Sequence, residues 1–356
     1  MRISFTGGGT LGSVTPLLAV FEAAREMKPD VQFDWIGTAD GPEGRLVREA
    51  GITFHSISSG RFRRFLTWRH VPDFFRVIKG FFQARALLKS RRPDVVVTAG
   101  SFVAAPVVWA AASRKIPTHV HQLDIRPGLA NRLSLPFAAS LSVSFEKSLK
   151  DFRRPKPVWT GSPVRRAMFR GSAEEGRRLF GLESGVPTVL VTGGGTGAAA
   201  LNDLVWKAVP FLCPKVQVIH LTGAGKSVPY PDAPSRYHQL EFITAEMPHA
   251  YAASDLVVTR AGVGALTELA ALGVPTIIVP IPASHQEDNA RLFAAAGAAV
   301  VLDELSTFSK HFAATILGLL EDQKKLADLR ARVKKLTKPD AATKVAELVI
   351  AAGTKR

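Results

Sequence analysis

Cysteine is nearly absent from this chain, acidic residues are few, and long apolar runs are missing. Cys213 is the single cysteine, so no disulfide can form within the chain and a reducing compartment is expected. No segment reaches the roughly 18–20 consecutive apolar residues that a membrane-spanning helix needs. The first residues enter a strand-like run without the apolar segment of a secretory signal. These absences predict a protein that is made in the cytoplasm and remains there.

The acidic residues are outnumbered, with 46 Lys and Arg against 30 Asp and Glu and a formal net charge of +16. Charge alone allows nucleic acid, an anionic membrane surface or phosphorylated small molecules as partners. Basic residues gather with aromatic residues between positions 61 and 89, in RFRRFLTWRHVPDFFRVIKGFFQARALLK. From Pro72 onward the apolar residues recur at helical spacing, and Pro72 followed by Asp73 is typical of a helix start.

This basic and aromatic segment has two interpretations. A helix of this composition fits a protein that lies on anionic lipid, where each nearby Lys or Arg contributes ~1 kcal/mol. The alternative is a core helix with ordinary solvated arginines. Because so many large aromatics beside so many charges cannot all face inward, we expect contact with the anionic inner-membrane surface rather than with nucleic acid, through Phe74, Phe75, Ile78, Phe81 and Phe82.

The same glycine-rich motif occurs twice in the chain. Thr-Gly-Gly-Gly-Thr occurs at residues 6–10 and again at 192–196, each time after a strand-like run and before a helix-like one. Glycine lets the backbone approach a ligand, and the first N–H groups of the following helix point outward, which is where anions bind. A single turn of this kind is equally well explained as a tight strand-to-helix connection. The duplication favours two similar halves that each hold part of an anionic ligand.

Strand-like and helix-like runs alternate through both halves of the chain. The expected strands lie at 3–5, 31–36, 52–57, 95–98, 118–121 and 141–144, and then at 188–191, 216–221, 240–243, 256–259 and 276–280. Such alternation predicts an α/β protein with parallel sheets and right-handed crossovers. We expect two Rossmann-like domains, residues 1–160 and 161–339, with the last helix, 340–356, returning to the first domain. Ligands of such sheets bind outside the carboxyl ends of the strands, so the cleft between the domains is the expected site.

Seven motifs together are similar to those of one known family. They are GGTLGSVTP at 8–16, AGSFVAAP at 99–106, HQLDIRPGLANR at 121–132, TGSPVR at 160–165, GGGTGAAALN at 193–202, RAGVGALTE at 260–268 and HQEDNA at 285–290. No single motif is decisive, but their order and spacing run nearly end to end. In this the chain resembles the MurG family of bacterial peptidoglycan glycosyltransferases. Members transfer N-acetylglucosamine from UDP-N-acetylglucosamine to the 4-hydroxyl of N-acetylmuramyl-pentapeptide on undecaprenyl pyrophosphate, which converts lipid I to lipid II.

The resemblance implies a GT-B architecture, in which two Rossmann-like domains face each other across a deep cleft. It also implies an inverting, metal-independent enzyme without a cofactor, bound peripherally to the cytoplasmic face of the cell membrane, with cell-wall or division proteins as further partners. The residues agree with metal independence, because no two aspartates are separated by one residue, as in the Asp-x-Asp pair of metal-dependent transferases. The departing UDP then needs helix N-termini and a cation such as Arg165.

The resemblance also implies the residues that bind the UDP-sugar donor. Glu268 matches the carboxylate that grips the ribose hydroxyls, Ile243 the backbone that reads the uracil edge, and Gln286 and Asn289 the side chains near the sugar. A carboxylate on a ribose diol can accept two hydrogen bonds while ionised. The full expected donor set is Thr10, Leu11, Gly12, Asp124, Arg165, Gly195, Thr196, Ile243, Val263, Gly264, Ala265, Leu266, Thr267, Glu268, Gln286 and Asn289.

Simpler interpretations of these residues remain open. Glu268 could be a carboxylate in the first turn of a helix, and Arg165 a surface arginine between domains. Asn131 and Asn202 could be ordinary cap or turn residues, and His285 is structural rather than catalytic.

The chain departs from the family pattern mainly on the acceptor and phosphate side. Leu11 and Ser13 stand where the family has glycine and histidine, and His121, Gln122, Leu123 and Asp124 stand where it has His-Glu-Gln-Asn. Ser101 and Phe102 replace glycine and tyrosine, Ser162 an asparagine, and Gly195 a serine. Acceptor contacts are still expected at Ser13, Ser101, Phe102 and Asn131. Because Ser13 cannot serve as histidine would, we expect Asp124, or His121 oriented by it, to take the acceptor proton; alternatively Asp124 holds a hydroxyl of the donor sugar.

Other functions stay open at this point. One is a glycolipid synthase that uses a nucleotide sugar but another lipid acceptor, such as diacylglycerol or a different polyprenyl lipid. Another is a non-catalytic sugar-nucleotide or lipid-binding relative that scaffolds cell-wall enzymes. A dinucleotide-dependent oxidoreductase is disfavoured, because neither glycine turn has the GxGxxG spacing with an acidic residue roughly 20 positions later. The sequence leaves open whether the sugar is N-acetylglucosamine or glucose, which acceptor lipid and peptide stem are used, and the oligomeric state.

Overall fold

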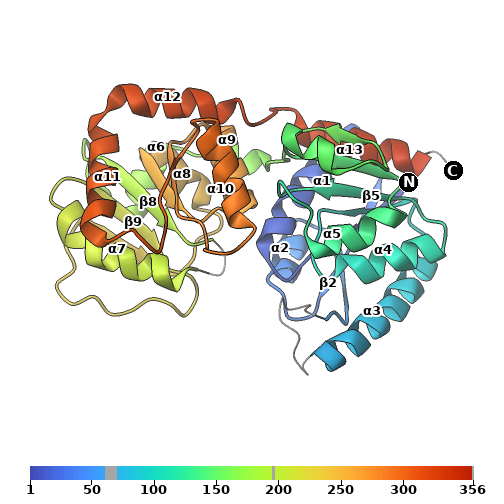
Figure 1. Cartoon of the computed structure of the whole chain (residues 1–356). Coiled ribbons are helices and arrows are strands. Elements are labelled where there is room, and N and C mark those ends of the chain that lie inside the picture. The colour runs from blue at the N-terminus through green and yellow to red at the C-terminus, as the bar shows by residue number, and fades with distance from the viewer. Residues whose placement is uncertain (61–69, 195–196, 355–356) are drawn as a thin grey trace. The chain divides into compact units, whose positions relative to one another are not determined.

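The computed structural model describes residues 1–60, 70–194 and 197–354. The chain divides into two compact units: unit 1 comprises residues 1–165 and 338–356, and unit 2 comprises residues 166–337. Each unit, taken by itself, is a parallel sheet with helices packed against it (Figure 1). The predicted α/β class, with two Rossmann-like sheets, is therefore confirmed.

The sheet of unit 1 has the strand order β3-β2-β1-β4-β5-β6-β7, and its neighbouring strands are parallel. The order reverses between β1 and β4. Ligands of open α/β sheets bind at the carboxyl edge of such a reversal, so the loops after β1 and β4 are the first place to look for a site. The strands are β1 (Arg2–Thr6), β2 (Gln32–Thr38), β3 (Thr53–Ile57), β4 (Val95–Thr98), β5 (Thr118–Gln122), β6 (Ser140–Val143) and β7 (Pro157–Trp159).

Helices cover both faces of this sheet. They are α1 (Thr15–Met27), α2 (Glu43–Glu49), α3 (His70–Arg91), α4 (Ala104–Ser113), α5 (Leu129–Ser134) and, from the end of the chain, α13 (Ala341–Thr354). On one face, Leu88 of α3 and Val107 of α4 share an apolar cluster with Ile36 and Val96 of the strands. On the other face α13 packs against α1 (Figure 1). The end of the chain is thereby part of unit 1.

The sheet of unit 2 has the order β10-β9-β8-β11-β12-β13, again with parallel neighbours. Its strands are β8 (Thr188–Thr192), β9 (Gln217–Leu221), β10 (Tyr237–Leu240), β11 (Leu256–Thr259), β12 (Thr276–Ile278) and β13 (Val300–Val301). The helices are α6 (Ala173–Phe180), α7 (Ala199–Leu212), α8 (Met247–Ala253), α9 (Val263–Leu272), α10 (Gln286–Ala295), α11 (Ser309–Glu321) and α12 (Gln323–Lys334). The main apolar core joins α7 and α11 to one face of this sheet, with Val205 and Phe312 fully buried. Its strand order reverses between β8 and β11.

Three strands differ from the sequence expectation. The strand expected at 240–243 was misplaced, because β10 is Tyr237–Leu240 and pairs with β9 from Tyr237 opposite Val218 to Leu240 opposite Leu221. Tyr237 faces the core and its hydroxyl contacts the ring of His220 at 2.7 Å. The short strands β7 and β13 were not anticipated, since two or three residues show no periodicity.

Side chains as well as backbone join β5 to β6. The ring of His119 lies between Ser140 Oγ, 2.8 Å from Nδ1, and Ser142 Oγ, 2.9 Å from Nε2. The ring of His121 lies between Ser142 Oγ at 2.7 Å and Ser144 Oγ at 3.1 Å. Both rings are 0% exposed. Burial lowers the pKa of each histidine to about 3, so both are neutral at physiological pH.

The two buried histidines predict a steep loss of stability in mild acid. Between pH 6.5 and 3 the unfolded chain binds protons that the folded chain excludes, so the free energy of unfolding falls as pH falls, by about 1.4 kcal/mol per pH unit for each fully buried histidine. His121→Gln should therefore reduce this slope by about 1.4 kcal/mol per pH unit between pH 4 and 6, measured by urea unfolding at each pH. His285→Gln, a change of the same type at an exposed position, should follow the wild type. A His121→Gln slope equal to that of the wild type would contradict the assignment.

Candidate functional site

The first glycine-rich turn follows β1 and lies against the loop that follows β4. Ser101 Oγ donates to the carbonyl of Gly8 at 2.7 Å. Gly9 has a φ of 77°, and a Cβ there would lie 2.3 Å from the ring of Phe102. Only glycine fits a position that is both left-handed and in contact with an aromatic ring. The structure thus brings Ser101 and Phe102 to the turn, at the carboxyl edge of the sheet.

The loop after β5 joins the same edge through Gln122. Its Nε2 donates to the carbonyls of Asp124 at 2.7 Å and Arg126 at 3.1 Å, and its Oε1 accepts from Asn131 Nδ2 at 2.6 Å. Asn131 is only 5% exposed, and its Oδ1 has no hydrogen-bond partner among the described residues. A Cβ on Gly100 would lie 3.1 Å from that oxygen. Asn131 therefore lies beside the loop after β4, with a buried acceptor that a donor group could satisfy.

Other expected residues of unit 1 surround this edge. Ser13 is buried in the short 3-10 helix Leu11–Ser13, and its Oγ also lacks a partner within the described chain. Leu11 is half-buried, and Thr10 and Gly12 are exposed on the rim. A buried hydroxyl or amide oxygen without a partner costs about 1–3 kcal/mol. Two such atoms, at Ser13 and Asn131, are available at this edge to accept a hydrogen bond from a polar ligand or from water.

The two candidates for the catalytic base occupy different environments. His121 is fully buried, and both of its ring nitrogens face serine hydroxyls. The expectation that His121 takes the acceptor proton is therefore corrected, because a ring sealed inside the sheet cannot reach a substrate. Asp124 is half-buried in the loop that Gln122 fixes. Of the two, Asp124 alone is partly exposed.

Arg165 and Ser162 lie beyond β7, near the end of the first segment of unit 1. Arg165 is half-buried, Ser162 is buried, and neither Arg165 Nε nor Ser162 Oγ has a hydrogen-bond partner among the described residues. A guanidinium with an unfilled donor suits a phosphate ligand.

In unit 2 six consecutive expected donor residues, 263–268, lie in α9. Gly262 precedes the helix without a side-chain cap, and the first hydrogen bond of the helix runs from Leu266 N to Gly262 O at 3.1 Å. The N–H groups of Val263, Gly264 and Ala265 belong to the first turn, which has no intrahelical acceptor for them. Thr267 Oγ1 donates to Val263 O at 2.8 Å, so its hydroxyl serves the helix itself.

Glu268 and Ile243 belong to two different segments of unit 2. Glu268 is half-buried on α9, and the hydroxyl of Tyr251 on α8 donates to Glu268 Oε2 at 3.3 Å. The contact fixes one face of the carboxylate and leaves the group partly open to solvent. Ile243, in the loop after β10, is 9% exposed.

Gln286 and Asn289, expected near the donor sugar, both contact the loop that precedes α9. Gln286 Oε1 accepts from the N–H of Ala261 at 3.1 Å and of Ile281 at 3.3 Å. Asn289 is 1% exposed, and its Nδ2 donates to the carbonyl of Ala261 at 3.0 Å. Both side chains point from α10 to the residue before Gly262. Asn289 and Gln286 therefore support the turn that begins α9, and their contact with the donor sugar stays a prediction.

The second glycine-rich turn is described only at its ends, and the expected donor residues Gly195 and Thr196 lie outside the described part. Lys226 Nζ donates to the carbonyl of Gly197 at 3.3 Å. Asn202 is neither a cap nor a turn residue: its Nδ2 donates to Thr222 O at 2.9 Å and its Oδ1 contacts His220 Nε2 at 3.1 Å. These bonds tie α7 and the end of the turn to β9.

Several residues that hold these loops were not anticipated. Arg260, 6% exposed, donates to the carbonyl of Val279 at 3.1 Å and pairs with Glu304, so it links the loop after β11 to the loop after β12. Glu43 is fully buried beside the first glycine turn. Arg260 stands within a quoted motif, and glycines at 37, 41 and 44 surround Glu43 in sequence. The motif around Arg260 and the glycines around Glu43 were the only hints in the sequence, and neither indicates which groups these side chains contact.

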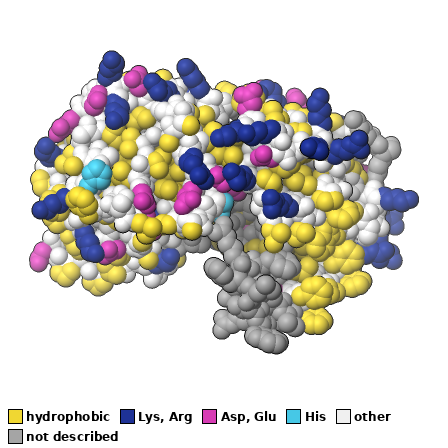
Figure 2. Space-filling view, viewed as in Figure 1, with side chains coloured by type: hydrophobic (Ala, Val, Ile, Leu, Met, Phe, Trp, Pro, Cys, Tyr) yellow, Lys and Arg dark blue, Asp and Glu magenta, His cyan; other side chains and the backbone are white. Residues whose placement is uncertain are grey.

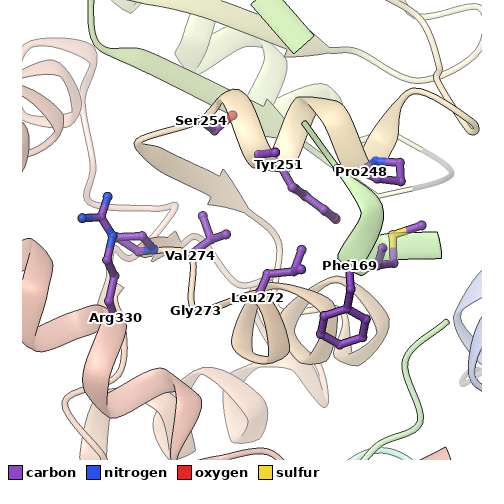
Figure 3. Close-up of a pocket in the computed structure, with 12 residues that line it drawn as sticks. Phe169, Pro248, Tyr251, Ser254, Leu272, Gly273, Val274 and Arg330 are labelled. Atoms are coloured by element: carbon purple, nitrogen blue, oxygen red, sulfur yellow. The ribbon is translucent and has the colours of Figure 1, made fainter. Parts of the chain in front are cut away.

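A cavity of about 270 Å³ lies at the opposite edge of the unit 2 sheet. It is bounded by Leu272 and Gly273 at the end of α9 and by Val274 just before β12, with Phe169 at one end and Arg330 at the other (Figure 3). Tyr251 also lines it. None of the expected site residues lines this cavity, although Tyr251, which donates to Glu268, does. Among the described residues, no group of three or more His, Cys, Asp or Glu could hold a metal ion.

Comparison with known proteins agrees with this arrangement of two sheets. Models of the glycosyltransferase family 28 N-terminal domain and C-terminal domain match residues 3–143 and 188–345. The chain is 38% identical over 352 residues, 98% of each chain, to the UDP-N-acetylglucosamine--N-acetylmuramyl-(pentapeptide) pyrophosphoryl-undecaprenol N-acetylglucosamine transferase of Lachnoclostridium phytofermentans. It is 39% identical to the transferase of the same name from Shouchella clausii over 307 residues, 85% of this chain and 86% of that one.

A solved structure gives the same result. The crystal structure of Acinetobacter baumannii MurG matches with a TM-score of 0.73 and 26% identity, covering 98% of this chain and 99% of that one. The chain therefore has the two Rossmann-like parallel-sheet domains of a GT-B glycosyltransferase, the fold class that the resemblance implied. With both domains matched and the relatives similar over nearly their whole length, the chain belongs to glycosyltransferase family 28 and, within it, to the MurG family.

Proposed function

We propose that this protein transfers N-acetylglucosamine from UDP-N-acetylglucosamine to the 4-hydroxyl of N-acetylmuramyl-pentapeptide on undecaprenyl pyrophosphate, converting lipid I to lipid II in peptidoglycan synthesis. The observation that carries the proposal is the 38% identity, over 98% of each chain, to a transferase named for this reaction. The residues of both units supply the chemistry that the transfer needs.

Unit 2 holds the donor. The diphosphate binds the open N–H groups at the start of α9, a contact worth about 0.3–1 kcal/mol per charge and up to ~2 when partly buried. Glu268 accepts hydrogen bonds from the two ribose hydroxyls while Tyr251 fixes its orientation. Gln286 and Asn289 keep Ala261 in place, so the first amides of α9 are preorganised before the donor arrives. Arg165 stays a predicted cation for the phosphates of the departing UDP, and the predicted contacts at Gly195 and Thr196 lie outside the described residues.

Unit 1 holds the acceptor. The 4-hydroxyl oxygen forms a bond to the anomeric carbon while the bond from that carbon to the diphosphate oxygen breaks, which inverts the configuration. UDP leaves with the electron pair, and the hydroxyl proton passes to a base. Asp124 takes this proton, because it is the partly exposed candidate. Gln122 holds its loop and also contacts Asn131, at the same edge of the sheet where Ser101 and Phe102 meet the glycine turn.

The lipid-linked acceptor places the enzyme at a membrane surface, and α3 supplies the contact. Phe74, Phe75 and Phe82 are 55%, 64% and 63% exposed and Ile78 is 38% exposed. Figure 2 shows hydrophobic side chains gathered where Figure 1 draws α3. Phe81 differs from the other four, because it packs against the apolar cluster beneath the helix. The basic residues 61–69 lie outside the described part of the chain, and no described helix is both long enough and apolar enough to cross a membrane. We place the protein peripherally on the cytoplasmic face.

The reaction and the donor site can be tested together. Wild-type protein should release UDP from UDP-N-acetylglucosamine when lipid I is added in detergent, and little without it. Glu268→Ala should raise the dissociation constant for UDP roughly 10- to 100-fold, or about 1.4–2.8 kcal/mol, measured by calorimetric titration. The matched control is Glu174→Ala, an exposed carboxylate on α6 of the same unit. No UDP release by the wild type would refute the function, and unchanged UDP affinity in Glu268→Ala would refute the donor site.

The role of Asp124 gives a separate kinetic prediction. Asp124→Asn keeps the size of the side chain but removes the base, so kcat should fall roughly 10²- to 10⁴-fold while UDP affinity is retained. Asp30→Asn, an exposed aspartate of unit 1, serves as the control. If kcat is unchanged but the KM for the donor rises, Asp124 holds a hydroxyl of the donor sugar and is not the base.

Membrane binding through α3 predicts the outcome of a sedimentation experiment. Replacing Phe74, Phe75 and Phe82 by serine should weaken binding to vesicles containing phosphatidylglycerol at least about tenfold, because bound apolar area and basic charge act together. The control replaces Leu305 and Phe308 of unit 2, which are 81% and 65% exposed, and should bind as the wild type does. Equal sedimentation of the triple variant and the wild type would remove α3 from the contact.

A further inference from the structure

We propose that Glu43 is a positioning residue for the acceptor site, holding the first glycine-rich turn through a buried carboxylate. The inference rests on the proposed function for the identity of the substrate, and on the geometry of unit 1 for the role. Glu43 is the first residue of α2 and is 0% exposed. Within the described chain no Lys, Arg or His forms an ion pair with it.

Neutral donors surround this carboxylate instead. Glu43 Oε2 accepts from the N–H of Gly9 at 3.0 Å. Oε1 accepts from the N–H of Thr38 at 2.7 Å and from its hydroxyl at 2.6 Å. Hydrogen bonds to a charged acceptor are stronger than those between neutral groups. The carboxylate therefore bridges the turn after β1 to the end of β2.

The space that Glu43 occupies exists only because glycines line it. A Cβ on Gly8 would lie 2.0 Å from Glu43 Oε1, and a Cβ on Gly41 would lie 1.9 Å from Oε2. Neither position can carry a side chain while the carboxylate stays in place. Glycine is thus needed at position 8 to leave room for the Glu43 carboxylate, whether or not a ligand also approaches the backbone there.

Glu43 is one of three side chains that hold three successive residues of the turn. Trp35 Nε1 donates to the carbonyl of Gly7 at 2.9 Å. Ser101 Oγ donates to the carbonyl of Gly8 at 2.7 Å, and Glu43 accepts from the N–H of Gly9. The three come from β2, the loop after β4 and α2. The turn is thereby fixed at the edge that carries Ser13, Ser101 and Phe102, three of the residues expected to contact the acceptor.

The bridge needs two acceptor oxygens, which a carboxylate has and an amide does not. In Glu43→Gln the NH₂ group must face either the N–H of Gly9 or the N–H of Thr38, and a donor cannot pair with a donor. One of the backbone bonds is lost, and the turn can shift. Shifts of about 1 Å in a positioning element are enough to cost ~10²-fold in rate.

The test compares Glu43→Gln with Glu49→Gln. Glu49 lies on the same helix, is exposed, and pairs only with Arg45, at 2.7 Å, among the described residues. Glu43→Gln should lower kcat/KM for lipid I by about 10- to 100-fold, while the dissociation constant for UDP stays within about twofold of the wild type. Glu49→Gln should match the wild type in both. A folded Glu43→Gln protein with wild-type acceptor kinetics, or with equally weakened UDP binding, would overturn the positioning role.

Two further measurements keep the inference testable if Glu43→Gln does not fold. Glu43→Asp fits the same space and keeps the charge but is one methylene too short to reach the N–H groups of both Gly9 and Thr38. We therefore again expect a lower kcat/KM for lipid I with little change in the dissociation constant for UDP. In the wild type, the amide of Gly9 should exchange with solvent at least ~100-fold more slowly than an unstructured glycine. Fast exchange would overturn the inference. The exchange result does not depend on turnover, so it distinguishes failure of the Glu43 role from failure of the proposed function.

Discussion

The carboxyl edge of the unit 1 sheet depends on how the backbone N–H and C=O groups of the turn after β1 find hydrogen-bond partners. A buried N–H or C=O without a partner costs about 1–3 kcal/mol, and a glycine-rich turn offers no side chains of its own. The partners come from outside: Trp35 for Gly7, Ser101 for Gly8 and Glu43 for Gly9. The turn is thus rigid although its sequence is flexible, and rigidity is what lets a backbone bind a ligand without an added ordering cost.

Unit 2 solves the equivalent problem at α9 with different side chains. Ala261, just before the helix, has its N–H bound by Gln286 and its C=O bound by Asn289. Arg260 binds the neighbouring loop through Val279. In both units the loops at the carboxyl edge of the sheet are therefore held by side chains from other elements. This explains why a substitution far from the reacting atoms is expected to act on only one of the two substrates.

Sequence reasoning succeeded where the signal was local or repeated. Runs such as Val95–Thr98 and Leu256–Thr259 are fully buried strands of a parallel sheet, and their apolar character shows this directly. It failed where tertiary contacts decide. The strand at Tyr237–Leu240 is set by pairing with β9, which the more apolar run after it concealed. Gln286 and Asn289 have the chemistry of sugar ligands, but their support of the turn that begins α9 depends on where α10 points. Glu43 could not be found at all, because a carboxylate in a first turn is ordinarily solvated.

The loop after β5 shows how a change of residue type can relocate a charge. Gln122 donates twice, to Asp124 O and Arg126 O, and accepts once, from Asn131. A carboxylate at that position could accept from Asn131 but could donate to neither carbonyl, so this conformation of the loop requires an amide. Where the family pattern has glutamate followed by an amide two residues later, this chain has the amide first and the carboxylate second. The acid of the motif is thereby moved from a fully buried strand end to the half-buried Asp124. His121, by contrast, is buried between Ser142 and Ser144, so the proposed base is the residue of this motif that is partly exposed.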